Sequence, residues 1–199
     1  MADDMALARV LAEAFLHYPS MDYSFEGESE ESQLAKLVIV YKGLVEATRL
    51  YGEIVTSPDR TGALLWLPGK VFPLGLLREM RTSLVSLPFR IGFRPTWRLT
   101  SHEDASVDYI VEHGGPHIGV IWNVGVAPAG QRRGNCRFMI ETAINQMRAA
   151  GLTEVWLSTD TETNLIIYTK LGFQVMTDRM ISCSGLRNWV LSKSTASST

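Results

Sequence analysis

The second half of the chain alternates between apolar runs and segments with helical spacing, and this alternation limits the folds available to it. Residues 118–126 form a long apolar run with several β-branched side chains, and residues 154–158 form another. Between them, apolar residues of 132–150 recur at helical spacing, and Gly151 stands where helices commonly end. The pattern continues with a predicted helix over 164–171 and predicted strands over 173–181 and 186–191. A strand–helix–strand unit makes 118–126 and 154–158 a parallel pair, so we expect an α/β or α+β fold.

The first half contains predicted helices and one predicted hairpin. Apolar residues recur at helical spacing over 4–17, where Pro19 is expected to stop the helix, and again over 34–48. The short apolar runs 53–56 and 63–67 flank a Ser-Pro-Asp-Arg turn, which favours a β-hairpin.

The segment 70–113 has no clear register. It is rich in Leu, Phe, Met and Arg and is interrupted by Pro73, Pro88 and Pro95, so we expect two or three short helices. This stretch exceeds what the sheet needs, so we expect it to be an additional helical segment. We predict one domain over 1–191 and a disordered Ser/Thr-rich tail over 192–199.

Composition fits a single globular domain and excludes several classes. The chain has 199 residues, of which 46% are hydrophobic and 20% charged. A net charge of −2 excludes a globally basic nucleic-acid binder. Two cysteines without a C-x-x-C motif and four scattered histidines predict neither a disulfide framework nor a metal site. No apolar run approaches the about 20 residues that span a bilayer, and Asp3 and Asp4 replace the basic start of a signal peptide, so we expect a cytoplasmic protein without membrane contact.

The segment from Val124 to Cys136 is the strongest local signal for a binding site. It passes from a strand through a turn to a helix start, where free N–H groups and the helix dipole favour an anion. Gly134 allows close approach to the backbone, and Arg132 and Arg133 add positive charge. The simpler alternative is that these arginines are only solvated. The glycines fit neither a dinucleotide fingerprint nor a P-loop.

A second motif follows at 164–173, where Asn164 and Tyr168 share one helical face before Gly172-Phe173. Together with Gln131-x-x-Gly134-x-Cys136, this pattern resembles the acetyl-CoA-binding core of the GNAT acyltransferase superfamily. Trp66-x-Pro68-Gly69 and Arg187-x-Trp189 look loosely like its puromycin N-acetyltransferase branch. The resemblance implies the GNAT fold, in which a splayed parallel strand pair lies within a central mixed sheet flanked by helices.

The resemblance also implies a set of cofactor-binding residues. The loop amides of such proteins hold the pyrophosphate of CoA, and the pantetheine arm lies between the splayed strands. Carried over onto this sequence, the cofactor-binding positions are Val124, Gly125, Val126, Gln131, Arg132, Arg133, Gly134, Asn135, Cys136 and Asn164. Arg137 adds positive charge to the same helix start.

Acetyl transfer needs a neutral amine, a donor for the developing oxyanion and a proton for the departing thiolate. The resemblance implies that the Val126 N–H faces the thioester carbonyl and that Tyr168 points at the sulfur. A tyrosine has a pKa of about 10, against about 8.5 for a thiol, so it can donate this proton. We therefore predict that Tyr168 is the general acid; the alternative is a tyrosine packed on the sheet with a satisfied hydroxyl.

Two positions depart from the family pattern. Cys136 stands where Gly or Ala is usual, and its thiol is either a tolerated small side chain or, at a helix start, a group of lowered pKa. Ser158 stands where many relatives carry a carboxylate. The candidates for the general base are therefore Asp160, Glu112, His113 and His117, and we rank Glu112 first because it precedes the strand 118–126. Deprotonation through a water chain is the alternative.

The resemblance thus implies an N-acetyltransferase that uses acetyl-CoA, without a metal, to acetylate a small-molecule amine by direct transfer in a ternary complex. We expect the additional helical segment 70–113 to determine acceptor specificity. A non-catalytic CoA-binding domain and a protein acetyltransferase are the alternatives. Trp66 and Trp122 are expected in the core or in the acceptor pocket. The resemblance also suggests a homodimer.

Overall fold

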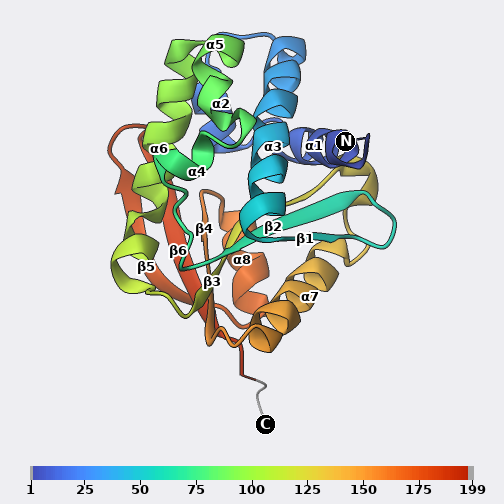
Figure 1. Ribbon diagram of the computed structural model, residues 1–199, viewed down its shortest axis with the longest axis vertical. Coiled ribbons are helices and arrows are strands. Elements are labelled where there is room, and N and C mark those ends of the chain that lie inside the picture. The colour runs from blue at the N-terminus through green and yellow to red at the C-terminus, as the bar shows by residue number, and fades with distance from the viewer. Residues whose placement is uncertain (1, 197–199) are drawn as a thin grey trace.

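A computed structural model describes residues 2–196 and contains one six-stranded sheet in the order β1-β2-β3-β4-β6-β5 (Figure 1). Its strands are β1 (Glu53–Thr56), β2 (Gly62–Pro68), β3 (Ile118–Val126), β4 (Glu154–Thr159), β5 (Gln174–Ile181) and β6 (Leu186–Ser194). Only β3 and β4 pair in parallel among the described strands, and the other neighbours are antiparallel. The predicted mixed sheet with a parallel pair is confirmed.

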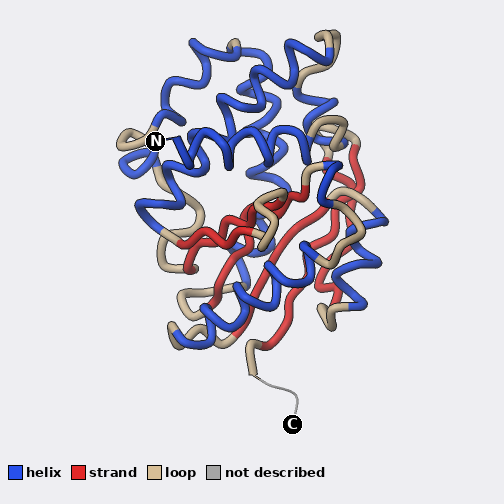
Figure 2. Tube along the Cα trace, turned by 90° about the vertical axis from the view of Figure 1, so that its right-hand side faces the viewer, coloured by secondary structure: helices blue, strands red, loops and turns tan. Residues whose placement is uncertain are grey.

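Helices cover both faces of this sheet, as Figures 1 and 2 show. They are α1 (Ala2–Phe15), α2 (Pro19–Ser24), α3 (Glu30–Tyr51), α4 (Leu76–Glu79), α5 (Leu87–Ile91), α6 (Phe93–His113), α7 (Asn135–Ala149) and α8 (Glu162–Lys170), with short 3₁₀ turns η1 (Ser83–Ser86) and η2 (Pro128–Gly130). The helices α7 and α8 lie on one face. The helices α1, α3 and α6 lie on the other, so the sheet is the middle layer.

Strand β2 shows why both faces must be covered. Successive side chains of a strand point to opposite faces. Leu64 and Trp66 pack with the apolar side chains of α7, whereas Ala63 and Leu65 pack with those of α1 and α3. All four are buried. This run of buried residues on alternating faces explains why β2 is apolar throughout.

The structure corrects the prediction for residues 70–113. Instead of only short helices, it contains the 21-residue helix α6 after the short α4 and α5. Pro95 is the third residue of α6, where a missing N–H costs nothing because the first helical N–H groups have no partner in the helix. Val107 and Ile110 pack on the sheet against Trp156. Tertiary packing therefore fixes a helix that the sequence pattern did not reveal.

Two smaller expectations are also corrected. Pro19 does not simply stop a helix, because it begins α2 after a short turn. Strand β6 extends to Ser194 and pairs with β4, so residues 192–194 are ordered, and the buried Thr195 binds Leu152 O through its hydroxyl. Residues 197–199 of the predicted tail lie outside the described residues. No helix in the described range is both long and apolar enough to span a bilayer.

Candidate active site

The site lies where β3 and β4 separate. These strands pair from Ile118–Glu154 to Val120–Trp156 only, and both continue beyond the last pair without pairing further. The unpaired part of β3 runs to Val126. Its N–H groups alternate between the two neighbours, and the Ala127 N–H donates to Thr61 O on the β2 side, so the Val126 N–H is directed toward the gap.

Three cavities adjoin this gap. The cofactor cleft lies between the loop after β3 and α8, and the central cavity lies between the diverging strands and α6. The apolar cavity lies between α3, the segment around α4 and α5, and α6. The cofactor cleft and the central cavity share Phe15, Tyr18, Val124, Asn164 and Tyr168. The central and apolar cavities share Met21, Phe72, Glu103, Val107, Trp122 and Asn123. The three cavities are therefore neighbours, in a row from the loop after β3 to the helices on the other face of the sheet.

The loop after β3 offers a row of unused hydrogen-bond donors. Gly134 has a φ of 81° and Arg132 a φ of 62°, both in the left-handed region. Within residues 2–196, the backbone N–H groups from Arg132 to Arg137 donate to no protein acceptor. Arg132, Arg133 and Arg137 are exposed beside them. The predicted anion site therefore has free N–H groups and exposed positive charge at the start of α7, with Arg133 4.0 Å from Asp59.

Asn135 fixes the shape of this loop from beneath. Its side-chain amide donates to Asp59 Oδ2 at 2.9 Å, Thr61 Oγ1 at 3.2 Å and Gly130 O at 3.0 Å. Hydrogen bonds from Asn135, Ser57 and Thr61 hold the pKa of Asp59 well below its usual range. Asn135 is buried, so its side chain supports the loop instead of pointing into the cofactor cleft.

Cys136 lines the cofactor cleft and packs against the core below it. Burial raises the pKa of its thiol to about 11, so the thiol is protonated at neutral pH. The alternative of a reactive thiol with a lowered pKa is wrong, because desolvation at this site disfavours the thiolate.

Tyr168 stands where the cofactor cleft and the central cavity meet. Its ring is buried and packs against Phe173, with centroids 5.9 Å apart. Burial raises the pKa of Tyr168 well above its ordinary value. Its hydroxyl forms no hydrogen bond with any described residue, which argues against the alternative of a satisfied core tyrosine. The proton of this phenol is therefore available to a group in the cleft.

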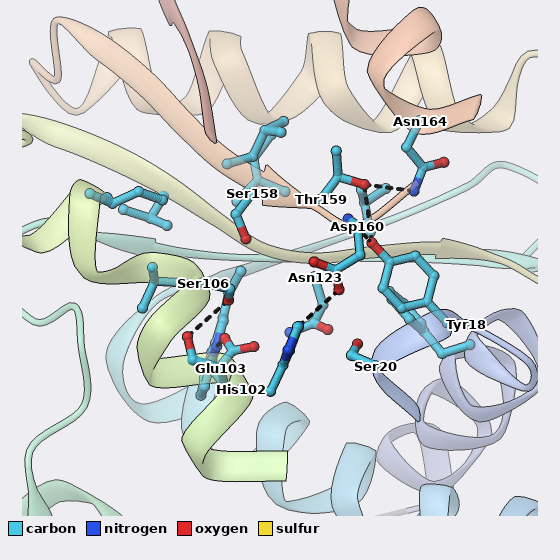
Figure 3. Close-up of a pocket in the computed structure, with 18 of the residues that line it drawn as sticks. Tyr18, Ser20, His102, Glu103, Ser106, Asn123, Ser158, Thr159, Asp160 and Asn164 are labelled. Atoms are coloured by element: carbon cyan, nitrogen blue, oxygen red, sulfur yellow. Dashed lines mark hydrogen bonds and ion pairs between the residues drawn. The ribbon is translucent and has the colours of Figure 1, made fainter. Parts of the chain in front are cut away.

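Asn164 and Tyr18 face each other across the same junction (Figure 3). The Asn164 amide donates to Thr159 Oγ1 at 3.2 Å, and the Tyr18 hydroxyl lies 3.0 Å from the same oxygen. Tyr18 also accepts a hydrogen bond from the Asp160 N–H at 2.8 Å. Burial and the charge of Asp160 raise the pKa of Tyr18 above its usual range. These contacts join α8 and the α1–α2 turn to the end of β4.

Asp160 and His102 form a buried pair beside this junction. His102 Nε2 lies 3.0 Å from Asp160 Oδ2, and Asn188 donates to Asp160 Oδ1 at 2.9 Å. Both carboxylate oxygens of Asp160 therefore have protein partners. His102 Nδ1 lies 2.9 Å from Ser184 Oγ. Asp160 was a candidate for the general base, and these contacts instead suit a role in holding His102 and α6 against the end of β4.

Glu103, the next residue of α6, has a different environment. Trp122 Nε1 donates to Glu103 Oε1 at 3.0 Å, while Oε2 has no hydrogen-bond partner among the described residues. Burial raises the pKa of Glu103 to about 7. This carboxyl lines both the central and the apolar cavities. A group that is partly ionised at neutral pH and open to the cavities has the properties of a general base.

Trp122 reaches Glu103 because the sheet is irregular there. Leu65 pairs with Asn123 and Trp66 pairs with Ile121, so Trp122 is an extra residue on β3. Such a bulge redirects a side chain. Trp122 lines the cavities, whereas Trp66 lies in the core and donates to Gln146 Oε1 at 3.0 Å.

The structure does not bring the other predicted base candidates to the cavities. Glu112, His113 and His117 are exposed, and none of them lines the gap between β3 and β4. Glu112 follows Glu103 by nine residues on α6, which is about 13 Å along the helix axis. His113 stacks on Tyr109 at 4.0 Å on the outer surface. The structure therefore places Glu112 away from the central cavity, and its role as the general base stays a prediction without support from its position.

Sequence reasoning missed Glu103, His102 and Tyr18. The first two lie on α6, whose helical register was not recognised, and Tyr18 lies in the turn before Pro19. A usable signal was present in the run 93–113, because Leu99, Val107 and Ile110 are apolar at helical spacing from one another.

Comparisons with known proteins agree with this geometry. The family model described as "Acetyltransferase (GNAT) family" matches residues 91–173, which include α6, β3, the loop and α8. A search of curated protein sequences found no significant match.

Solved structures share the fold at low sequence identity. The C-terminal condensation domain of Ebony, in complex with beta-alanyl-dopamine, has a TM-score of 0.63 at 12% identity, with 97% of this chain and 94% of that chain covered. An agmatine N-acetyltransferase in its apo form has a TM-score of 0.59 at 11% identity, covering 96% and 94%. The protein yncA from Salmonella typhimurium, solved with its cofactor acetyl-CoA, has a TM-score of 0.57 at 15% identity, covering 100% and 91%. The narrower resemblance to puromycin N-acetyltransferase stays a prediction. The family match over residues 91–173, the shared fold and the loop together make this chain similar to the GNAT family of acetyltransferases.

Proposed function

We propose that the protein transfers the acetyl group of acetyl-CoA to the amine of a small molecule, by direct attack within a ternary complex. The observation that carries this proposal is the position of Tyr168, with its free hydroxyl, where the cofactor cleft meets the central cavity. Two similar structures, an agmatine N-acetyltransferase and a domain that holds beta-alanyl-dopamine, support a small-molecule amine as acceptor.

The residues of the cofactor cleft fit CoA. The free N–H groups from Arg132 to Arg137 suit a pyrophosphate, and the neighbouring arginines complement its charge. Val124, Val126 and Asn164 line the cleft between this loop and Tyr168, where a pantetheine arm would lie. Gln131 donates to Val126 O at 3.3 Å, which supports the end of β3.

Acetyl-CoA supplies the thioester, and the protein's own groups handle the charges and protons. The Val126 N–H, directed into the gap, is placed to stabilise the oxyanion. Glu103 accepts a proton from the ammonium of the acceptor, directly or through water. The neutral amine nitrogen then forms the N–C bond as the C–S bond breaks, and the nitrogen loses its extra proton to solvent as the amide forms. Tyr168 donates its proton to the leaving thiolate and regains one from solvent.

Release of free CoA thiol from acetyl-CoA, measured with a panel of small primary amines, tests this proposal. We expect amine-dependent thiol release and saturable binding of acetyl-CoA. Arg133→Ala should raise the KM for acetyl-CoA roughly fivefold with little change in kcat, because the contact is the same in the ground and transition states. The matched control Arg90→Ala, an exposed arginine of α5, should leave this KM unchanged.

Three outcomes separate the hypotheses. Binding of acetyl-CoA without turnover on any amine or peptide would favour a CoA-binding domain. Turnover on peptides alone would favour a protein acetyltransferase. An unchanged KM in Arg133→Ala would remove this arginine from the cofactor site.

A further inference from the structure

The apolar cavity is a second feature that the acetyl-transfer chemistry does not require. It lies beside α3 and α6, and its empty space, counted together with adjoining open solvent, is about 1230 Å³. Most of its lining is aliphatic or aromatic, including Tyr41, Leu44, Phe72, Val85, Val107 and Trp122. A lining of this kind, with few polar groups, is typical of sites for apolar small molecules.

The charges in this cavity have one sign. Its charged lining residues are Glu79, Glu103 and Asp104, and the described lining includes no Lys, Arg or His. The segment 70–113 contributes several arginines elsewhere, so this distribution is not a matter of local composition. Burial and the charge of Asp104 raise the pKa of Glu79. An apolar space bordered by carboxyl groups suits a molecule that is apolar and carries a positive charge.

A buried hydroxyl without a partner points to the same cavity. Tyr41 of α3 lines it, is 1% exposed, and its hydroxyl has no hydrogen-bond partner within the described structure. The charge of Glu103 contributes to raising the pKa of Tyr41, so the two groups lie within electrostatic reach. Buried hydroxyls are normally hydrogen-bonded, so this unpartnered hydroxyl beside the cavity needs a partner that the described residues do not supply.

We propose that the acceptor is an apolar primary amine, with an aromatic or aliphatic skeleton in the apolar cavity and its ammonium at Glu103. This proposal rests on the proposed acetyl transfer, because Glu103 borders both the apolar cavity and the central cavity. Glu103 Oε2 accepts the hydrogen bond of the ammonium, while Trp122 keeps Oε1 in place. Amines with a second charge or several hydroxyls leave those groups in apolar surroundings and are poor acceptors.

The test compares apolar primary amines with polar ones. 2-Phenylethylamine and hexylamine represent apolar amines, and ethanolamine and 1,4-diaminobutane represent polar ones. At fixed saturating acetyl-CoA, we expect kcat/KM for the apolar amines to exceed that for the polar amines at least about tenfold. In calorimetry, 2-phenylethylamine should bind, whereas its uncharged analogue 2-phenylethanol should bind at least about tenfold more weakly.

Val85 offers a variant that tests the location of the acceptor. It lines the cavity and is 46% exposed, so Val85→Lys adds a positive charge at the cavity without disturbing buried packing. We expect the KM for 2-phenylethylamine to rise about tenfold in Val85→Lys and much less in the neutral variant Val85→Gln. Val111→Lys is the matched control, because Val111 is 49% exposed on α6 and does not line the cavity.

The outcomes separate this proposal from the proposed function. Turnover of polar amines with no preference for apolar ones would overturn the acceptor class and leave acetyl transfer standing. Equal effects of Val85→Lys and Val111→Lys would overturn the location. Binding of 2-phenylethylamine that Val85→Lys abolishes, without thiol release from any amine, would support the apolar amine site and contradict acetyl transfer.

Discussion

The indole Nε1 of Trp122 donates a hydrogen bond of 3.0 Å to Oε1 of Glu103, and this bond links the bulge of β3 to the middle of α6. It leaves the second carboxylate oxygen free toward the cavities. The indole stabilises the ionised carboxyl, while burial opposes ionisation more strongly and raises the pKa of Glu103 to about 7. One residue of the extra helical segment thereby becomes a base suited to neutral pH.

Replacing Glu103 by Gln should lower kcat about a hundredfold, because the amine loses its proton acceptor. In the wild type, kcat/KM should rise with pH through about 7 as Glu103 ionises, and this limb should disappear in the variant. Steady-state kinetics over a range from about pH 5.5 to 9 measure both effects. Glu112→Gln, on the exposed end of α6, is the control and should behave as the wild type.

The same substitution should stabilise the protein at high pH. The folded state binds the Glu103 proton more tightly than the unfolded chain, because the pKa rises from 4.5 to about 7 on folding. The ionised carboxyl therefore lowers the free energy of unfolding. This penalty is absent below pH 4.5 and fully present above pH 7. Glu103→Gln should raise the free energy of unfolding by up to about 3 kcal/mol above that range. Urea unfolding of the wild type and Glu103→Gln at pH 4.5 and pH 8 measures this effect. The same difference in free energy of unfolding at both pH values would contradict the prediction.

Tyr168→Phe removes the phenolic proton and keeps the packing against Phe173. We expect kcat to fall about tenfold to a hundredfold, while the KM for acetyl-CoA changes little. Because burial keeps the pKa of Tyr168 well above its ordinary value, activity should show no descending limb from this group below pH 10. Undiminished turnover would exclude Tyr168 as the general acid. Tyr109→Phe, outside the cavities, controls for the loss of a hydroxyl.

Asn135→Ala should loosen the loop that precedes α7. The change leaves Asp59, Thr61 and Gly130 without their shared donor, at a cost of about 1–3 kcal/mol in unfolding free energy. The KM for acetyl-CoA should rise as the free N–H groups lose their arrangement. Thermal unfolding and kinetics measure the two effects. Asn145→Ala on the exposed side of the same helix should produce neither.

Cys136→Ala should retain activity within about twofold, because a buried thiol of raised pKa takes no part in direct transfer. Thiol release with an amine acceptor measures this directly. In the wild type, alkylation at pH 7 should modify the exposed Cys183 first, as mass spectrometry would show. Loss of turnover in the variant, together with an acetylated Cys136 in the wild type, would instead indicate a covalent intermediate.

The sequence predicted the sheet better than the helices that cover one face of it. Strand β3 and the loop to α7 were recognisable because an apolar β-branched run, a turn and a glycine follow one another directly. The register of α6 was not, because Pro95 resembles a break although it sits in the first helical turn. Glu103 was missed for the same reason.

The sequence also did not reveal which part of α6 lies near the gap between β3 and β4. Glu112 precedes β3 in sequence, but a helix that crosses the sheet carries its end away from the gap and its middle toward it. The pKa of Glu103 likewise depends on burial by segments far apart in the chain, including Trp122. Local patterns do not contain that information.

Helix α6 and the shorter segment before it contribute different residues to the cavities, and this has an evolutionary consequence. Glu103 and His102 are held by a long helix that packs on the sheet, whereas Leu76, Leu84, Val85 and Leu87 belong to α4, η1 and α5. Mutations in those short elements can reshape one wall of the apolar cavity and leave Glu103 and His102 in place. Related proteins could therefore bind different acceptors through substitutions in the segment 72–88 while keeping the residues of α6 unchanged.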